Sequence, residues 1–157
     1  MKINYGSPAG LAKFLPMRKN RFLSMTACVF LLASYQAYSQ AAFPTVTVNL
    51  SYPQYQRLKM DGGYVYIEGA GMRGIILYRA GENAYMAYER ACPHHPEENC
   101  AIVQVDGSSL FMIDHCCKSS FNFSDGQPTG GPAQRPLIQY RIEIMGNTLK
   151  ISDEIIN

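Results

Sequence analysis

Two short segments of the chain carry side chains that bind metals. Cys92-Pro93-His94 places a thiol and an imidazole two positions apart, and His115-Cys116-Cys117 follows after one predicted hairpin. Thiolate and neutral imidazole are common ligands of zinc and of iron–sulfur clusters. Two loops of this kind, brought side by side by a hairpin, predict a single site that takes ligands from both.

Disulfides compete with such a site for the same sulfurs. Four cysteines lie beyond residue 40, namely Cys92, Cys100, Cys116 and Cys117. In an exported protein, four cysteines most often form two disulfides, and spacing alone does not decide how they pair. The residues therefore leave both a metal site and a pair of disulfides open.

Residues 1–39 are predicted to be an upstream extension followed by a secretory signal peptide at 17–39. The basic segment Met17–Arg21 precedes an apolar run from Phe22 to Ser34, and Ala37-Tyr38-Ser39 supplies a small-residue cleavage site. The run is short for a membrane span, although a single N-terminal membrane helix is the alternative. We expect the mature chain to begin at Gln40 and to be periplasmic or secreted, touching a membrane only through an uncleaved signal.

Removing this segment changes the charge of the chain. Five of the 14 Lys and Arg residues precede residue 40, so 9 remain against 12 Asp and Glu, a net charge near −3. A mildly acidic domain with scattered charges lacks the basic patch that nucleic acid requires. We therefore expect no nucleic-acid partner.

The elements that position the two loops are expected to be short β-strands. Asp106-Gly107 predicts a hairpin turn, and Ser51 is expected to cap a helical turn from Pro53 to Leu58. No stretch has a helical apolar stripe, so residues 40–157 are predicted to form one all-β domain, a sandwich or small barrel of about nine or ten strands. Alternating apolar residues between turns predict strands at 45–50, 64–67, 74–78, 85–89, 101–105, 110–113, 137–145 and 148–151.

From about Thr45 to Ile151 the chain resembles a Rieske-type domain. Cys92-Pro93-His94 matches the Cys-x-His of that family's first ligand loop. Ser120–Gly126 resembles the strand and turn after its second loop, and Gly131-Pro132-Ala133 matches the loop that covers its cluster. The resemblance implies a Rieske-like antiparallel sandwich of short strands with two ligand-bearing loops. It also implies a 2Fe–2S cluster, in which two Cys bind one iron and two His bind the other.

The second loop departs from the family's Cys-x-x-His pattern. Alignment on Phe121–Gly126 puts Asp114 at the second Cys position and Cys117 at the second His position. The ligands implied by this register are Cys92, His94, Asp114 and Cys117. The same register implies a disulfide between Cys100 and Cys116, like the one that high-potential members carry.

A second register remains open, because alignment on Cys116 makes that residue the second Cys ligand. Ser119 then stands where the second His should be. The second His is absent in either register. His95 is expected to be a surface residue of the first loop, whereas His115 is either exposed or a substitute ligand.

The implied function is electron transfer with a redox partner protein of unknown identity, by a carrier or accessory redox domain rather than a stand-alone enzyme. Neutral imidazoles raise Rieske potentials to about −150 to +300 mV, so a thiolate in place of one His should lower the potential. Zinc accepts the same four ligands. A cluster-free binding module, stapled by Cys100–Cys116 and by Cys92–Cys117, is the further alternative.

Overall fold

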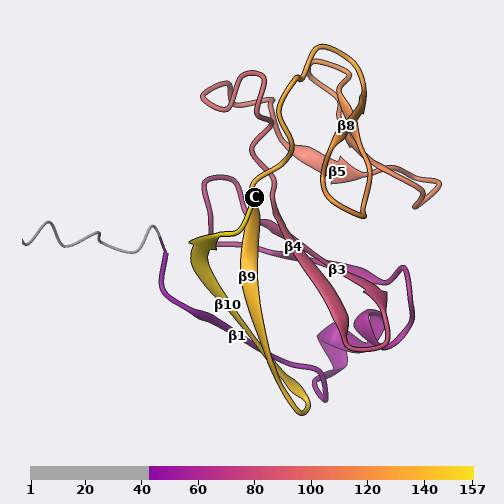
Figure 1. Cartoon of the computed structure of the whole chain (residues 1–157), viewed down its shortest axis with the longest axis vertical. Helices are drawn as coiled ribbons and strands as arrows, with labels where there is room; N and C mark the ends of the chain where they lie inside the picture. The colour runs from indigo at the N-terminus through magenta and orange to yellow at the C-terminus, as the bar shows by residue number, and fades with distance from the viewer. Residues whose placement is uncertain (1–42) are drawn as a thin grey trace, which may run out of the picture. The chain divides into compact units, whose positions relative to one another are not determined.

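The computed structural model describes residues 43–157, so the predicted extension and signal peptide lie outside the described residues. The described part contains ten strands and one short 3-10 helix, η1 (Figure 1). In chain order the elements are β1 (Val46–Asn49), η1 (Pro53–Lys59), β2 (Tyr64–Ile67), β3 (Ile75–Gly81), β4 (Ala84–Glu89), β5 (Val103–Val105), β6 (Met112–Asp114), β7 (Ser120–Phe121), β8 (Pro128–Gly130), β9 (Gln139–Met145) and β10 (Thr148–Ile155).

Six of the strands form one antiparallel sheet in the order β1-β10-β9-β4-β3-β2. Every strand of this sheet contributes to one hydrophobic cluster, which includes Val48, Leu77, Ala87 and Leu149, and Leu58 of η1 packs into it. Because strands from both edges meet in one cluster, the sheet curls around its own core. Each large apolar side chain buried there contributes about 1.5–3 kcal/mol to stability.

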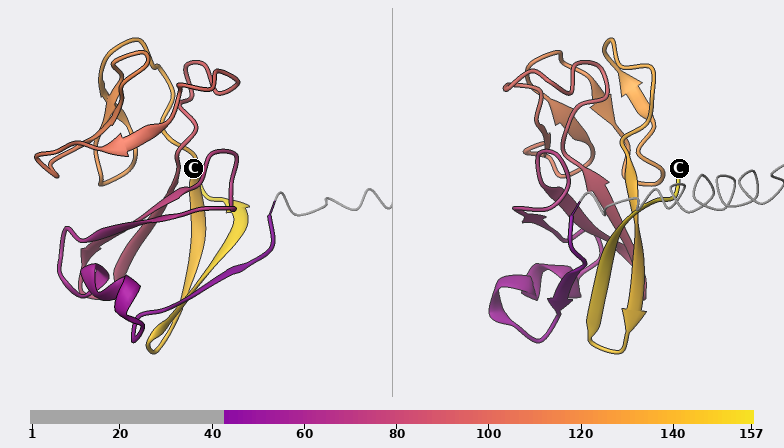
Figure 2. Two further views of the ribbon diagram at one scale, coloured as in Figure 1. Left: turned by 180° about the vertical axis from the view of Figure 1, so that it is seen from behind. Right: turned by 90° about the vertical axis from the view of Figure 1, so that its left-hand side faces the viewer.

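The other four strands form a smaller antiparallel sheet in the order β5-β6-β7-β8. The chain enters this sheet after β4 and returns to the larger one at β9, as Figure 2 shows from two sides. A second hydrophobic cluster joins the two sheets, in which Ile76 and Tyr88 of the larger sheet pack with Met112 and Phe121 of the smaller. Successive side chains of a strand point to opposite faces, so β3 and β4 serve both cores.

The predicted all-β antiparallel fold is confirmed, and two local predictions need correction. Ser51 does not cap the helical turn, because Tyr52 takes the N-cap position without a side-chain hydrogen bond. The strand predicted to start at Leu110 starts at Met112, and Leu110 is exposed. The Asp106 carboxylate accepts hydrogen bonds from Ser108, and this turn lengthens the hairpin loop. Strand β8 was not predicted.

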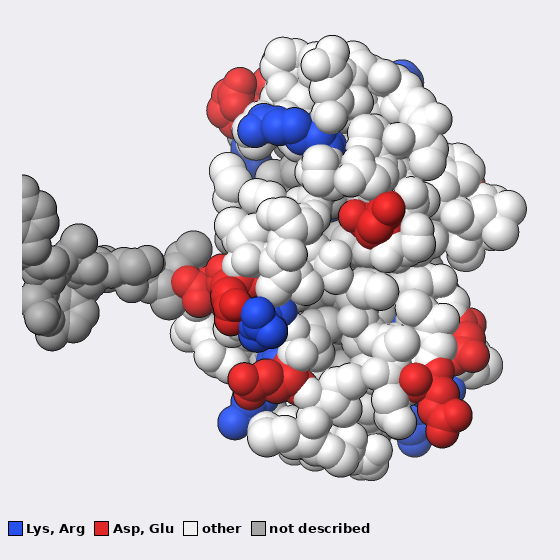
Figure 3. All heavy atoms as spheres, viewed as in Figure 1, with Lys and Arg blue, Asp and Glu red and all other residues white. Residues whose placement is uncertain are grey.

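Charged side chains of both signs are interspersed on the face of the domain shown in Figure 3. The described ion pairs join Arg79 to Asp61, Arg90 to Glu68 and Arg141 to Glu154. Between residues 43 and 157, no helix is long and apolar enough to cross a membrane.

Candidate metal centre

The first ligand loop leaves the larger sheet at the end of β4 and runs to Ala101. An isolated bridge between Ala91 and Ile102 closes its base. The N–H of Cys92 donates to the carbonyl of Ala101 at 3.1 Å, and the Cys92 side chain is fully buried. The first cysteine therefore sits at the rigid base of the loop rather than at its tip.

Arginine side chains from two other segments fix the outer part of this loop. The guanidinium of Arg73 donates to the carbonyls of Glu97 and Glu98 at 3.2 and 3.3 Å. Arg135 donates to the carbonyl of Pro93 at 2.8 Å. These contacts fix a stretch of backbone that is not paired with any strand.

Glu89, which sequence reasoning missed, links the base of the first loop to the segment that carries Arg73. Its buried carboxylate accepts hydrogen bonds from the N–H groups of Met72, Arg73 and Ala91 at 2.7–2.9 Å, and from the Tyr140 hydroxyl at 2.8 Å. Gly71 makes room for it, since a Cβ there would lie 2.2 Å from the carboxylate. One carboxylate thus orders both Arg73 and the residue before Cys92.

The second ligand loop connects β6 to β7 by a tight turn. The Asp114 N–H donates to the carbonyl of Ser119 at 2.9 Å, and the Lys118 N–H donates to the carbonyl of Asp114 at 2.8 Å. The Asp114 side chain is buried, and its Oδ1 accepts the N–H of Cys116 at 2.8 Å. Lys118 adopts a left-handed conformation with φ 63°, which allows the turn to close.

A disulfide between Cys100 and Cys116 joins the two loops, with 5.5 Å between their Cα atoms. This is the pair that the family resemblance implied. Because its sulfur is bonded to Cys100, Cys116 offers no thiolate here, and the register that makes it a ligand does not match this structure. The carboxylate of Glu98 lies 3.8 Å from the Cys100 sulfur and 3.6 Å from that of Cys116.

The segment Gly131-Pro132-Ala133, which the resemblance expects to cover a cluster, lies against the second loop. The Ala133 N–H donates to the Ser119 hydroxyl oxygen at 3.0 Å. Gly131 has a φ of +82°, and a Cβ there would lie 2.5 Å from the Cα of Ser119 and 2.6 Å from the carbonyl oxygen of Lys118. Only glycine permits so close an approach in that conformation.

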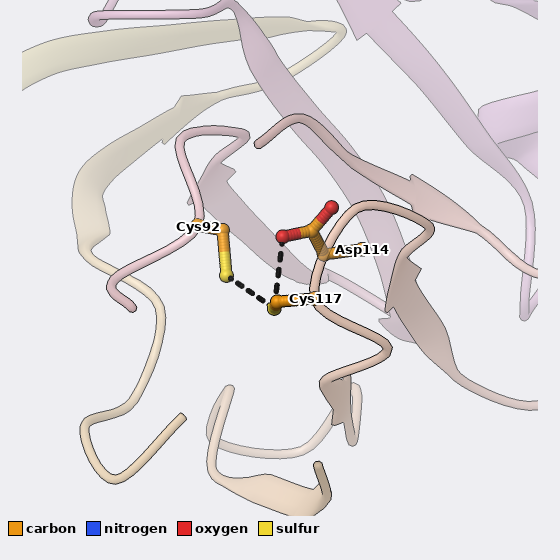
Figure 4. A group of neighbouring side chains, drawn as sticks. All are labelled: Cys92, Asp114 and Cys117. Atoms are coloured by element: carbon orange, nitrogen blue, oxygen red, sulfur yellow. Dashed lines mark hydrogen bonds between the residues drawn. The ribbon is translucent and has the colours of Figure 1, made fainter. Parts of the chain in front are cut away.

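Cys92, Asp114 and Cys117 converge between the loops, and their ligand atoms all lie within 4.8 Å of one another (Figure 4). The two sulfurs are 3.6 Å apart. The Cys117 sulfur also lies 3.0 Å from Asp114 Oδ2 and 3.0 Å from the Ser119 hydroxyl. The Cys117 thiol has one proton, which it can donate either to the Asp114 carboxylate or to the Ser119 hydroxyl oxygen.

This environment shifts two pKa values in opposite directions. Burial is the main reason that the pKa of Cys92 is raised to about 12, and Asp114 and Cys117 raise it further, while the N–H of His94 acts against them. Burial also raises the pKa of Asp114, but hydrogen bonds from the thiols of Cys117 and Cys92 and from the N–H groups of residues 116 and 117 outweigh it. The net pKa of Asp114 is below its usual value.

The three histidines lie outside this group of donors. His94 is half-buried, its ring centroid is 4.0 Å from that of His95, and it borders a cavity with Pro132 and Arg135. His95 and His115 are exposed. Of the four predicted ligands, the structure therefore brings three together and leaves His94 beside them on the first loop.

The donor set fits an iron–sulfur centre in number and location, with two thiols, a carboxylate and an imidazole on two adjoining loops. It departs from the Rieske pattern in kind, since the second loop offers Asp and Cys where that pattern has Cys and His. The two sulfurs are spaced as for two thiolates on a single ion, because metal–sulfur bonds of about 2.3 Å in tetrahedral geometry put sulfurs about 3.8 Å apart. In the register that puts Asp114 at the second Cys position, Cys92 and Cys117 would instead bind different irons, so a cluster requires these two sulfurs to move apart.

No protein-family model and no curated protein matches the chain. Among solved structures, a ferredoxin in the complex of reduced oxygenase and oxidized ferredoxin of carbazole 1,9a-dioxygenase matches with 18% identity and a TM-score of 0.50, covering 72% of this chain and 96% of that one. The ferredoxin of carbazole 1,9a-dioxygenase from Nocardioides aromaticivorans IC177 gives 18% and 0.45 over 68% and 95%. The Sphingomonas yanoikuyae B1 ferredoxin gives 18% and 0.42 over 61% and 92%.

At this level of identity the first of these matches shows the fold alone. The domain is an all-β, Rieske-like antiparallel sandwich, the class that its sheets and its two loops define.

Proposed function

We propose that this chain is an exported electron-transfer domain that holds a 2Fe–2S cluster between its two loops. The observation that carries the proposal is the convergence of Cys92, Asp114 and Cys117 within 4.8 Å, in a Rieske-like fold. The covering loop at 131–133 and the disulfide between the loops support it, because both hold the ligand loops in place.

Four residues would hold the cluster: Cys92 and His94 from the first loop, and Asp114 and Cys117 from the second. The cluster supplies reversible one-electron chemistry when bound. Two thiolates and a carboxylate bring one more negative charge than the two thiolates of a Rieske site, which favours a potential below the usual Rieske range of about −150 to +300 mV.

We further propose that the domain exchanges electrons with a partner protein and is not an enzyme by itself. The ferredoxin of the first solved structure is found in a complex with an oxygenase. The export proposal rests on the signal-like residues 17–39. N-terminal sequencing should find Gln40 first, and a mature protein that retains Phe22–Ser34 would contradict export by cleavage.

Iron and sulfide analysis of the anaerobically prepared chain tests the proposal. We expect about two irons and about two sulfides per chain, with visible absorption that dithionite bleaches. Cys92→Ser and Cys117→Ser should each lose the iron, whereas His115→Ala, which changes an exposed neighbour, should retain it. Full iron content in both cysteine variants would refute the assigned ligands.

A cluster-free binding module is the second candidate, and one observation favours it. Every buried side-chain nitrogen and oxygen atom of residues 43–157 has a hydrogen-bond partner, the Asp114 oxygens included. The site is therefore satisfied without an ion. A colourless chain that stays free of iron after refolding with iron and sulfide would select this candidate.

A further inference from the structure

Cys92 and Cys117 are the free cysteines of the described residues, and their sulfurs are 3.6 Å apart. A disulfide bond is about 2.0 Å long, so the sulfurs need to approach by only about 1.5 Å. Cys117 lies on a loop whose partner loop is already tethered through Cys100 and Cys116. That tether keeps the two thiols together in the unloaded chain.

We propose that Cys92 and Cys117 form a reversible dithiol–disulfide pair that closes the site. Oxidation consumes two of the proposed ligands, so an oxidised chain cannot be loaded and a reduced chain can. The loading part of this inference rests on the proposed function, whereas the thiol–disulfide exchange does not. The two candidate functions then correspond to two redox states of one site.

The oxidant is a low-molecular-weight or protein disulfide, RSSR. The Cys117 sulfur attacks one sulfur of RSSR, forming a mixed disulfide and releasing RSH, which takes up the thiol proton. The Cys92 sulfur then attacks the Cys117 sulfur and expels the second RSH. Two thiols are oxidised and one external disulfide is reduced, so electrons and protons balance.

The burial of the two side chains fixes the order of these steps. Cys92 is fully buried and packs in the cluster with Ala101, Ala133 and Leu137, so an external disulfide cannot reach its sulfur. Cys117 is only half-buried. The external reagent must therefore attach to Cys117, and Cys92 must be the residue that releases it.

Oxidised glutathione is the probe, and the full chain is first freed of iron with a chelator. After treatment, remaining thiols are blocked with N-ethylmaleimide and the chain is cut after Arg90, Glu98, Phe111 and Lys118. These cuts put Cys92, Cys100 and the pair Cys116-Cys117 on three separate fragments. We expect the Cys92 fragment to become linked to the Cys116-Cys117 fragment, and dithiothreitol to release it.

Two variants decide the order of the steps. Cys92→Ser should accumulate one glutathione on Cys117, because no buried thiol remains to displace it. Cys117→Ser should leave Cys92 unmodified and unlinked. The inference is overturned if the wild-type Cys92 fragment stays unlinked at high oxidised glutathione, or if Cys92 becomes linked in the Cys117→Ser variant.

The same chain, reduced and then refolded with iron and sulfide, separates this inference from the proposed function. Linkage without iron uptake after reduction would sustain the thiol pair and refute the cluster. Iron uptake by the reduced chain, together with an unlinked Cys92 fragment after oxidation of the iron-free chain, would sustain the cluster and refute the pair.

Discussion

Glu89→Gln is the most informative single change outside the ligands, because it alters the charge of a buried side chain and keeps its shape. In the native domain one carboxylate oxygen accepts the Met72 N–H and the Tyr140 hydroxyl, and the other accepts the N–H groups of Arg73 and Ala91. Glutamine retains one oxygen and puts an amide N–H₂ group where the other stood. That group faces hydrogen-bond donors.

The best arrangement of the glutamine points its N–H₂ group at the Tyr140 hydroxyl, which can rotate and accept. The Met72 N–H is then left unsatisfied, at a cost of about 1–3 kcal/mol. The two bonds to the remaining oxygen fall from charge-assisted strength, about 1.5–3 kcal/mol each, to about 1 kcal/mol. Part of this loss is offset, because the neutral glutamine does not carry the desolvation cost of a buried charge. We therefore expect a net loss of about 2–4 kcal/mol out of a typical 5–15 kcal/mol.

Urea unfolding measures the loss as a lower midpoint at an unchanged slope. Glu143→Gln, an exposed glutamate on β9, is the matched control and should stay within about 0.5 kcal/mol of the wild type. If Glu89→Gln behaves like this control, the carboxylate does not organise the first loop, and the account of how Cys92 is positioned is wrong.

Three further changes test other parts of the site. Cys116→Ser should lower the unfolding free energy by about 3 kcal/mol, because it opens a loop of sequence separation 16, and an unchanged midpoint under oxidising conditions would contradict the tether. Gly131→Ala should cost about 2–5 kcal/mol in the same assay through overpacking and a left-handed φ, whereas Gly107→Ala, which has open space, should cost little. Burial raises the pKa of Cys92 from 9.0 to about 12 and also raises that of Tyr140, so the folded state keeps protons that the unfolded chain releases. Stability should therefore be complete below about pH 9 and fall toward pH 12, and a flat profile of urea midpoints would refute this.

The larger sheet was predictable because its strands alternate apolar and polar residues and end in turns with strong sequence signals. β8 was not, since Pro128-Thr129-Gly130 has no such alternation and becomes a strand only by pairing with β7. Leu110 misled the prediction because its apolar side chain continues the strand pattern. The Asp106 turn leaves it exposed in the hairpin loop instead.

The candidate site, like the fold, was predictable from the sequence only in part. The residue types on the two loops pointed to metal-binding chemistry, but only the structure shows which donors converge and that His94 stays outside them. Glu89 reads in the sequence as a surface charge at the end of a strand. Its role depends on the turn at Gly71–Arg73, whose N–H groups at Met72 and Arg73 lie 17 and 16 residues before it in the sequence. A glutamate in an apolar strand just before a ligand loop was the one available signal.

Electron paramagnetic resonance of the iron-loaded, dithionite-reduced chain shows whether a cluster lies between the two loops. A 2Fe–2S cluster between the loops predicts one unpaired electron for about every two irons, and it predicts that Cys117→Ser abolishes the signal. A signal from isolated single irons would contradict the proposed function. So would a chain that takes up no iron and keeps Cys92 and Cys117 without a bound metal.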